Sequence, residues 1–176
     1  SNGFIGPDQP ADNKPIYDEK LNSWVAPFFM APINTKNIHR SNALMDHIYG
    51  EDFCYNEMWI QGTGDEGKAA ADFISKSNPL SNAPQPGEGP SRESRENGNY
   101  DLLFCGDIDD KSIHVSVTGD MDPGYGSTSK MITESAVCLV KECDDLKGGI
   151  YTSASSMGTK LIKRLVDNAG LTFELE

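Results

Sequence analysis

The chain has little positive charge. Its 176 residues carry 15 Lys and Arg against 27 Asp and Glu, so its net charge is −12 at pH 7. A surface of that sign repels phosphate backbones and anionic lipid headgroups. The sequence also has no uninterrupted apolar run as long as a membrane span requires. We therefore expect no nucleic-acid partner and no membrane span.

Metal-ligand patterns are also scarce. The residues concerned are His39, His47, His114, Cys54, Cys105, Cys138 and Cys143. The histidines have no metal-ligand spacing with the cysteines, and no C-x-x-C pair is present. Each cysteine has apolar sequence neighbours, which is typical of buried thiols. We therefore expect reduced thiols and no metal site. No basic segment followed by an apolar segment, the pattern of a secretory signal, is visible near the start of the sequence. We expect a cytoplasmic location.

The length and composition are those of an ordinary globular domain, with 37% hydrophobic and 24% charged residues. Residues 1–22 are rich in Pro, Gly, Asp and Asn and predict an extended N-terminal arm. A single domain is expected over residues 23–176. The chain begins with Ser-Asn-Gly, which is typical of a cloning scar, so we expect it to be a piece of a longer protein.

Hydrophobic periodicity predicts elements of both kinds. The first half predicts a β-leaning stretch at 24–30, a helix at about 32–47, a strand at 53–61, a short helix at 67–76 and a long loop at 77–99. The second half predicts a hairpin of strands 100–106 and 112–118, helices at 127–142 and 153–169, and a final strand at 171–176. Gly170 is placed to cap the last helix. This pattern indicates an α+β fold with a mixed, largely antiparallel sheet packed with helices.

The stretch DPGYGSTSKM, Asp122 to Met131, raises the question of a nucleotide site. A dinucleotide fingerprint, G-x-G-x-x-G, needs a third glycine for close helix packing, and Ser129 occupies that place. Two aspartates also stand just before the glycines, where they would repel a phosphate. The alternatives are a tight turn that leads into a helix capped by Ser or Thr, or a helix start that offers amide donors to a polar ligand. In the last case Tyr125 would form an exposed wall of the pocket.

The stretch HRSNAL is a second candidate. Arg40 stands beside a hydroxyl and an amide residue on the expected helix, a combination that can bind a carboxylate or phosphate. An exposed arginine among ordinary helix residues explains the same pattern. From the residues alone, no catalytic pair or triad can be assigned, and the reaction is not disclosed.

Several segments together resemble the C-terminal part of saccharopine dehydrogenase-like oxidoreductases, in particular the branch called trans-acting enoyl reductases. They are WVAPFFMAPINTKNIHRSNAL, YGEDFCY, PGEGPSRESRENG, VTGDMDPGYGSTSKMITESAVCL and GGIYTSASSMGTKLIKRLVDNAGLTFELE. Their order and spacing run, with gaps, from Trp24 to the end of the chain. This series is far more specific than a single glycine motif.

The resemblance implies a second, non-Rossmann domain that contacts substrate and helps to form an oligomer. NAD(P) would be held by an N-terminal Rossmann domain that this chain lacks, so the chain alone would bind no cofactor. The small-molecule substrate would belong to the full-length protein. The implied substrate-binding residues are Asn34, Arg40, Ser41, Asn42, Tyr125, Gly126 and Ser127.

Two departures and one corollary accompany the resemblance. His39 stands where the family pattern has a second basic residue, often Arg, which weakens the case for an anion site of two arginines. Ser153 stands where the family tends to have Pro, which should loosen the start of the last helix. Without the Rossmann domain, the apolar stripe of Met157, Leu161 and Leu165 would lose part of its partner, so we expect a homo-oligomer. The alternative functions are a non-catalytic binding or assembly module on the same fold, and an independent nucleotide-binding protein.

Overall fold

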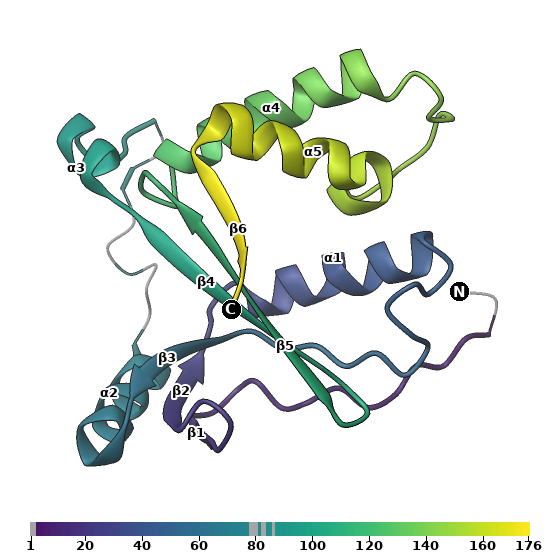
Figure 1. The fold of residues 1–176 in the computed structure, drawn as a ribbon. Coiled ribbons are helices and arrows are strands. Elements are labelled where there is room, and N and C mark those ends of the chain that lie inside the picture. The colour runs from purple at the N-terminus through teal and green to yellow at the C-terminus, as the bar shows by residue number, and fades with distance from the viewer. Residues whose placement is uncertain (1–2, 78–80, 82–83, 86) are drawn as a thin grey trace. The chain divides into compact units, whose positions relative to one another are not determined.

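The computed structural model describes residues 3–77, 81, 84–85 and 87–176 (Figure 1). Contacts divide the chain into two compact units, residues 1–83 and 84–176. This division falls inside the long loop that we expected at residues 77–99, of which residues 78–80, 82–83 and 86 lie outside the described part. The single domain over residues 23–176 stays a prediction.

The α+β class is confirmed in both units. Each unit combines helices with a three-stranded sheet. The expectation of one mixed sheet is wrong, because the described strands form two separate sheets in which every pairing is antiparallel. Short antiparallel strands can be joined by turns and need no crossover helix. The sequence pattern of strands and helices therefore fits two small sheets as well as one larger sheet.

Unit one, residues 1–83, contains β1 (Ile16–Asp18), β2 (Ser23–Pro27), α1 (Ala31–Leu44), β3 (Met58–Gly62) and α2 (Gly64–Lys76). The strand order is β1-β2-β3, and α2 packs against β2. The centre of this packing is formed by small apolar residues. Val25, Ala26 and Ala71 have exposed fractions of 2%, 0% and 0%. Side chains of this size let the helix approach the sheet closely.

Two expected elements of unit one end earlier or begin later than the sequence indicated. The helix expected to reach residue 47 ends at Leu44, because Asp46 and His47 adopt left-handed backbone angles, φ 53° and 59°, that do not continue a right-handed helix. The strand expected from residue 53 begins only at Met58. Residues 53–57 lie instead beside the N-terminal arm, which itself contributes β1 to the sheet.

Unit two, residues 84–176, contains α3 (Arg92–Asn97), β4 (Tyr100–Ile108), β5 (Lys111–Gly119), α4 (Gly126–Glu142), α5 (Ser153–Ala169) and β6 (Leu171–Leu175). The strand order is β4-β5-β6, so the predicted hairpin and final strand are confirmed. The expected loop at 77–99 includes a short helix that the sequence analysis missed. Its start is capped by Ser91 Oγ, which accepts a hydrogen bond from Ser94 N at 3.1 Å.

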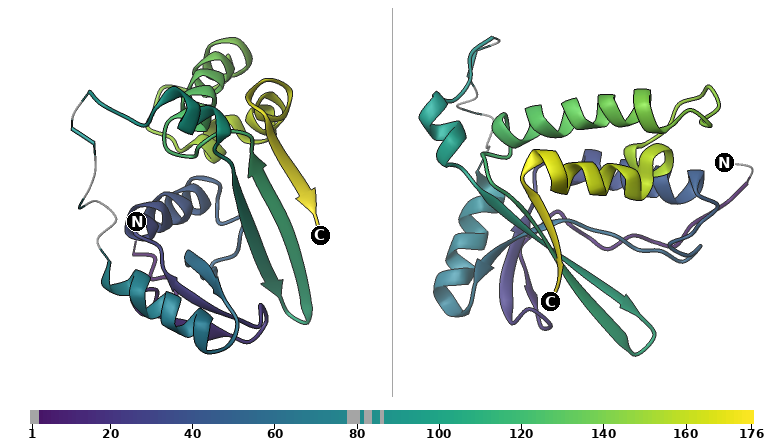
Figure 2. Two further views of the ribbon diagram at one scale, coloured as in Figure 1. Left: turned by 90° about the vertical axis from the view of Figure 1, so that its left-hand side faces the viewer. Right: turned by 45° about the horizontal axis from the view of Figure 1, so that its top comes forward.

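Helices α4 and α5 lie side by side and enclose the core of unit two (Figure 2). The core residues are Cys138, Cys143, Met157, Leu161, Leu165, Ala169 and Leu171. The expectation that the α5 stripe has lost part of its partner is therefore wrong. Met157, Leu161 and Leu165 are only 5%, 9% and 8% exposed, because α4 and β6 already cover them.

Both ends of α5 are determined by local hydrogen bonds. At the start, the Thr152 and Ser155 side chains bond to each other's backbone N–H in a capping box. The start is thus fixed without the proline that Ser153 replaces. At the end, Gly170 adopts the left-handed conformation with φ 73°, as the sequence predicted. Within the helix, Gly158 departs from helical geometry and produces a kink.

The thiols follow the sequence expectation in part. None of the four, which all lie within the described residues, forms a disulfide, and Cys138 and Cys143 are buried as expected. Cys54 and Cys105 are exposed, so the expectation of burial is wrong for them. An apolar sequence neighbourhood does not bury a residue whose strand face or loop is open to solvent. Within the described ranges, no group of three or more His, Cys, Asp or Glu could hold a metal ion. None of the helices described is long and apolar enough to cross a membrane.

Candidate functional site

The DPGYG turn of unit two is organised by one carboxylate. The Asp122 side chain accepts hydrogen bonds from the backbone N–H groups of Gly124 at 3.0 Å, Tyr125 at 3.0 Å and Gly126 at 2.6 Å. These are the amides that a phosphate would use at this helix start. They are satisfied by the chain itself, which favours the turn interpretation. The cap expected from Ser or Thr is wrong, because Asp122 takes that role.

The charge of Asp122 fits this role. Partial burial alone would raise its pKa, but the three N–H donors of residues 124–126, together with the positive charge of Arg95, hold the pKa below its usual range. Arg95 also fixes the backbone here, because its carbonyl accepts a hydrogen bond from Asp122 N at 3.1 Å. The anion that neutralises this helix start is thus built into the chain.

Three predicted site residues follow in the same turn. Ser127 is fully buried, and its Oγ lies 2.8 Å from the hydroxyl of Tyr100. Tyr125 is 47% exposed. Gly126 has no room for a side chain, since a Cβ there would lie 2.8 Å from Asp122 Oδ2. The structure gives Ser127 and Gly126 packing roles, and substrate contact stays a prediction for all three.

The other predicted site residues lie on α1 in unit one. Asn34 Nδ2 donates to Glu57 Oε2 at 2.8 Å. Ser41 is 4% exposed and its Oγ donates to the Asn37 carbonyl at 2.8 Å. Arg40 is exposed. Their role in substrate binding stays a prediction.

Asn42 organises the turn after α1. Its Oδ1 accepts from Tyr49 N at 2.9 Å, and its Nδ2 donates to the Gly50 carbonyl at 2.8 Å. Its side chain is 4% exposed. These bonds span Asp46 and His47, the left-handed residues that end the helix, so the Asn42 side-chain amide stabilises this turn.

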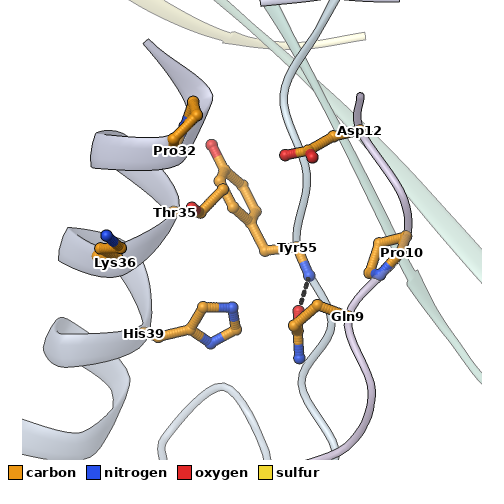
Figure 3. A pocket seen from close by; sticks show the side chains of 8 residues that line it. All are labelled: Gln9, Pro10, Asp12, Pro32, Thr35, Lys36, His39 and Tyr55. Atoms are coloured by element: carbon orange, nitrogen blue, oxygen red, sulfur yellow. Dashed lines mark hydrogen bonds between the residues drawn. The ribbon is translucent and has the colours of Figure 1, made fainter. Parts of the chain in front are cut away.

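A cavity of about 550 Å³ lies beside α1, within unit one. It is lined by Gln9, Pro10, Asp12, Pro32, Thr35, Lys36, His39 and Tyr55 (Figure 3). This site could not be recognised from the sequence, because its walls come from the N-terminal arm, α1 and the segment 53–57, which are far apart in the chain. His39, which the sequence had offered as a histidine without metal-ligand spacing and as a departure from a family motif, points into this space.

Tyr55 and Glu57 form a polar network at the edge of this cavity. The Tyr55 hydroxyl donates to Glu57 Oε1 at 2.9 Å, while Asn34 occupies the other carboxylate oxygen. Burial, and then the charge and hydrogen bond of Glu57, raise the pKa of Tyr55 far above its usual range. Tyr55 therefore remains a neutral phenol and hydrogen-bond donor near neutral pH, and the network holds α1 against the segment 53–57.

A complete G-x-G-x-x-G, not recognised from the sequence, stands at Gly62, Gly64 and Gly67 between β3 and α2. Gly62 and Gly64 have left-handed φ angles of 103° and 62°, which a tight turn here requires. A Cβ on Gly67 would lie 2.2 Å from the Gly62 carbonyl oxygen. The three glycines thus serve the turn and the close approach of helix to strand.

The surroundings of this motif differ from those of a dinucleotide site. β3 belongs to an antiparallel sheet, whereas the fingerprint belongs to a parallel βαβ unit. Asp65 and Glu66 place two negative charges in the first turn of α2, where a pyrophosphate would lie. The glycine pattern is therefore explained by local packing.

Comparison with curated proteins gives relatives over most of the chain. A protein of Mycobacterium tuberculosis named "Putative trans-acting enoyl reductase Rv2449c" is 32% identical over 90% of this chain and 43% of its own length. A "Trans-acting enoyl reductase" of Mycobacterium ulcerans is 29% identical over 81% of this chain and 39% of its own length. The chain is similar to oxidoreductase-like proteins of this name. It matches no family model and no solved structure.

The chain spans less than half the length of these relatives, 43% and 39%. The resemblance to trans-acting enoyl reductases that the sequence motifs indicated is thus supported by similarity along most of the chain. The larger remainder of each relative has no counterpart here.

Proposed function

We propose that this chain is the C-terminal, substrate-binding and oligomerisation domain of an NAD(P)-dependent oxidoreductase that resembles saccharopine dehydrogenase-like proteins. The observation that carries the proposal is the 32% identity over 90% of this chain but only 43% of the relative. A part that aligns so fully with a minority of a longer enzyme is expected to depend on the rest of it. Hydride transfer would need the cofactor domain, so the chain alone is inactive.

The surroundings of the two glycine motifs support the proposal that the cofactor is bound outside this chain. Asp122 occupies the amides of one motif, and Asp65 and Glu66 place negative charge at the other. Both arrangements oppose a pyrophosphate at the helix start. NAD(P) would therefore be bound by the N-terminal domain, while this chain contributes contacts to the substrate.

A calorimetric titration with NADPH and NADH tests the proposal. The chain alone should show no saturable heat up to about millimolar cofactor, whereas the protein extended upstream by a Rossmann domain should bind at micromolar levels. Reading the coding sequence upstream in the same frame gives an independent test, since a G-x-G-x-x-G between a strand and a helix should be present there.

Two results would overturn the proposal. Saturable cofactor binding by the chain alone, lost in Gly126→Val, would make the DPGYG turn a phosphate site. An upstream frame without a nucleotide-binding domain would favour the alternative, a non-catalytic binding or assembly module on this fold.

The proposal includes self-association, but through a surface other than the buried α5 stripe. The turn end of the β4–β5 hairpin and the end of β6 expose Ile108, Ile113 and Leu175, with exposed fractions of 71%, 54% and 72%. Apolar side chains of this size favour burial against another surface. Light scattering of the chain at high concentration should show a dimer or larger assembly, and Ile113→Lys should weaken it.

A further inference from the structure

The cavity beside α1 has a basic wall. Lys36 and His39 both line it, and they lie three residues apart on α1, so they share one face of the helix. Figure 3 shows the imidazole of His39 directed into the space between α1 and the segments 9–12 and 53–57. Its Nε2 is buried and has no hydrogen-bond partner among the residues that the structure describes. A ligand atom that reached this nitrogen would therefore add a hydrogen bond that the described part of the chain does not supply.

The opposite wall is acidic. It is formed by the N-terminal segment, from which the Asp12 carboxylate faces the cavity (Figure 3). Gln9 fixes this segment to the rest of unit one. Its Oε1 accepts a hydrogen bond from Tyr55 N at 3.0 Å, and its Nε2 donates to the Phe53 carbonyl at 3.3 Å. The acidic wall is therefore held at a defined place relative to the basic one.

The rest of the lining is largely apolar. The ring of Tyr55 lies between the two walls, Pro32 belongs to α1 and Pro10 to the N-terminal segment (Figure 3). Thr35 adds a hydroxyl that already donates to the Ala31 carbonyl. The hydroxyl of Tyr55 is already engaged with Glu57. This surface suits a short carbon chain or ring, and the polar selectivity comes from the two walls.

We propose that this cavity binds a small zwitterion, with its carboxylate on the side of Lys36 and His39 and its ammonium group on the side of Asp12. A ligand with only negative charge would meet Asp12 and the field of a chain of net charge −12. A ligand with only positive charge would meet Lys36. A dipolar molecule satisfies both walls at once. This inference goes beyond the proposed function and needs no cofactor.

The test uses three probes of similar size at equal ionic strength, namely 4-aminobutyrate, butyrate and butylamine. The imidazole signals of the three histidines of the chain are followed by NMR, and His39→Gln identifies the signal of His39. We expect 4-aminobutyrate to shift that signal saturably, with a Kd about tenfold lower than those of the other two probes. His47 and His114 serve as internal references and should not shift.

Variants of the two walls then separate the contacts. Lys36→Gln should reduce the affinity for 4-aminobutyrate to that for butylamine, and Asp12→Asn should reduce it to that for butyrate. Lys141→Gln, at an exposed position of α4, should bind like the unsubstituted chain. Thermal unfolding of each variant shows whether it is folded.

The proposal is overturned if no probe shifts the His39 signal, or if all three probes shift it equally. It is also overturned if folded Lys36→Gln and Asp12→Asn variants bind 4-aminobutyrate as the unsubstituted chain does. None of these results depends on NAD(P), so they leave the proposed oxidoreductase function untouched.

Discussion

The Asp122 carboxylate and the backbone N–H of Gly126 are joined by a hydrogen bond of 2.6 Å. This bond closes the turn that leads into α4. The same glycine has no room for a Cβ, which would lie 2.8 Å from Asp122 Oδ2 and 3.1 Å from the Arg95 carbonyl oxygen. The turn, α3 and the start of α4 are thus assembled around one carboxylate, and a nucleotide phosphate would have to displace it.

Asp122→Ala should lower the free energy of unfolding by about 1–2 kcal/mol at pH 7, because three backbone donors lose their acceptor. Chemical denaturation measures this change. Asp144→Ala, at an exposed residue after α4, is the control and should change it by less than about 0.5 kcal/mol. Equal effects of the two substitutions would contradict the role given to Asp122.

The effect of Asp122→Ala should also depend on pH. The folded pKa of Asp122 lies below its usual value, so its stabilising contribution is present above the unfolded-state pKa of about 4. It is lost as the pH falls through the folded-state pKa. The difference between the unsubstituted chain and Asp122→Ala should therefore shrink as denaturation curves are measured at pH values below about 4.

Gly170→Ala should destabilise unit two by about 1 kcal/mol or more, because a left-handed residue gains a Cβ. That Cβ would also lie 2.2 Å from Asp120 Oδ2. Gly148→Ala is a matched control, since a Cβ there meets no atom within 4 Å. Thermal unfolding should show a lower Tm for Gly170→Ala alone, and a similar Tm for both variants would argue against the cap.

Gly67→Ala should cost more than Gly64→Ala in unit one. A Cβ on Gly67 would lie 2.2 Å from the Gly62 carbonyl oxygen, so β3 and α2 must separate, at a cost of about 2–3 kcal/mol. A Cβ on Gly64 meets no atom within 4 Å and adds only the cost of a left-handed residue, about 1 kcal/mol. Denaturation of the two variants measures the difference, and the reverse order would contradict the packing role of Gly67.

Arg164→Met should lower the Tm more than Lys163→Met. Arg164 pairs with Glu134 at 2.6 Å and with Glu142 at 2.7 Å, and its side chain is only 20% exposed. Lys163 pairs with Asp167 on the surface, where its side chain is 76% exposed and water weakens the attraction. Removal of Arg164 leaves two neighbouring carboxylates of α4 without their shared partner. Thermal unfolding at low and high salt compares the variants, and an equal loss would refute this difference.

Elements set by local patterns could be predicted from the sequence. The helix expected at 153–169 is α5, and Gly170 ends it as expected. Its apolar spacing and its caps involve residues only a few positions apart, so no distant contact is needed to recognise them. The hairpin of β4 and β5 and the α+β class were predictable for the same reason.

Features that depend on distant contacts could not be predicted. The α5 stripe was expected to have lost part of its partner, but α4 and β6 bury it. The spacing of charged residues on α5 likewise does not show that Arg164 pairs with two glutamates of α4. Periodicity identifies the apolar face of a helix but not the element that covers it.

The sequence by itself determined the α+β class, the long helices of unit two and the Gly170 cap, the acidic charge and the resemblance to trans-acting enoyl reductases. Only the tertiary structure decided that Asp122 fills the amides of the DPGYG turn, that Gly67 serves packing, and that Lys36, His39 and Asp12 face one cavity. The first group follows from composition and from neighbours in the chain. The second depends on hydrogen bonds and contacts whose geometry exists only after the chain has folded.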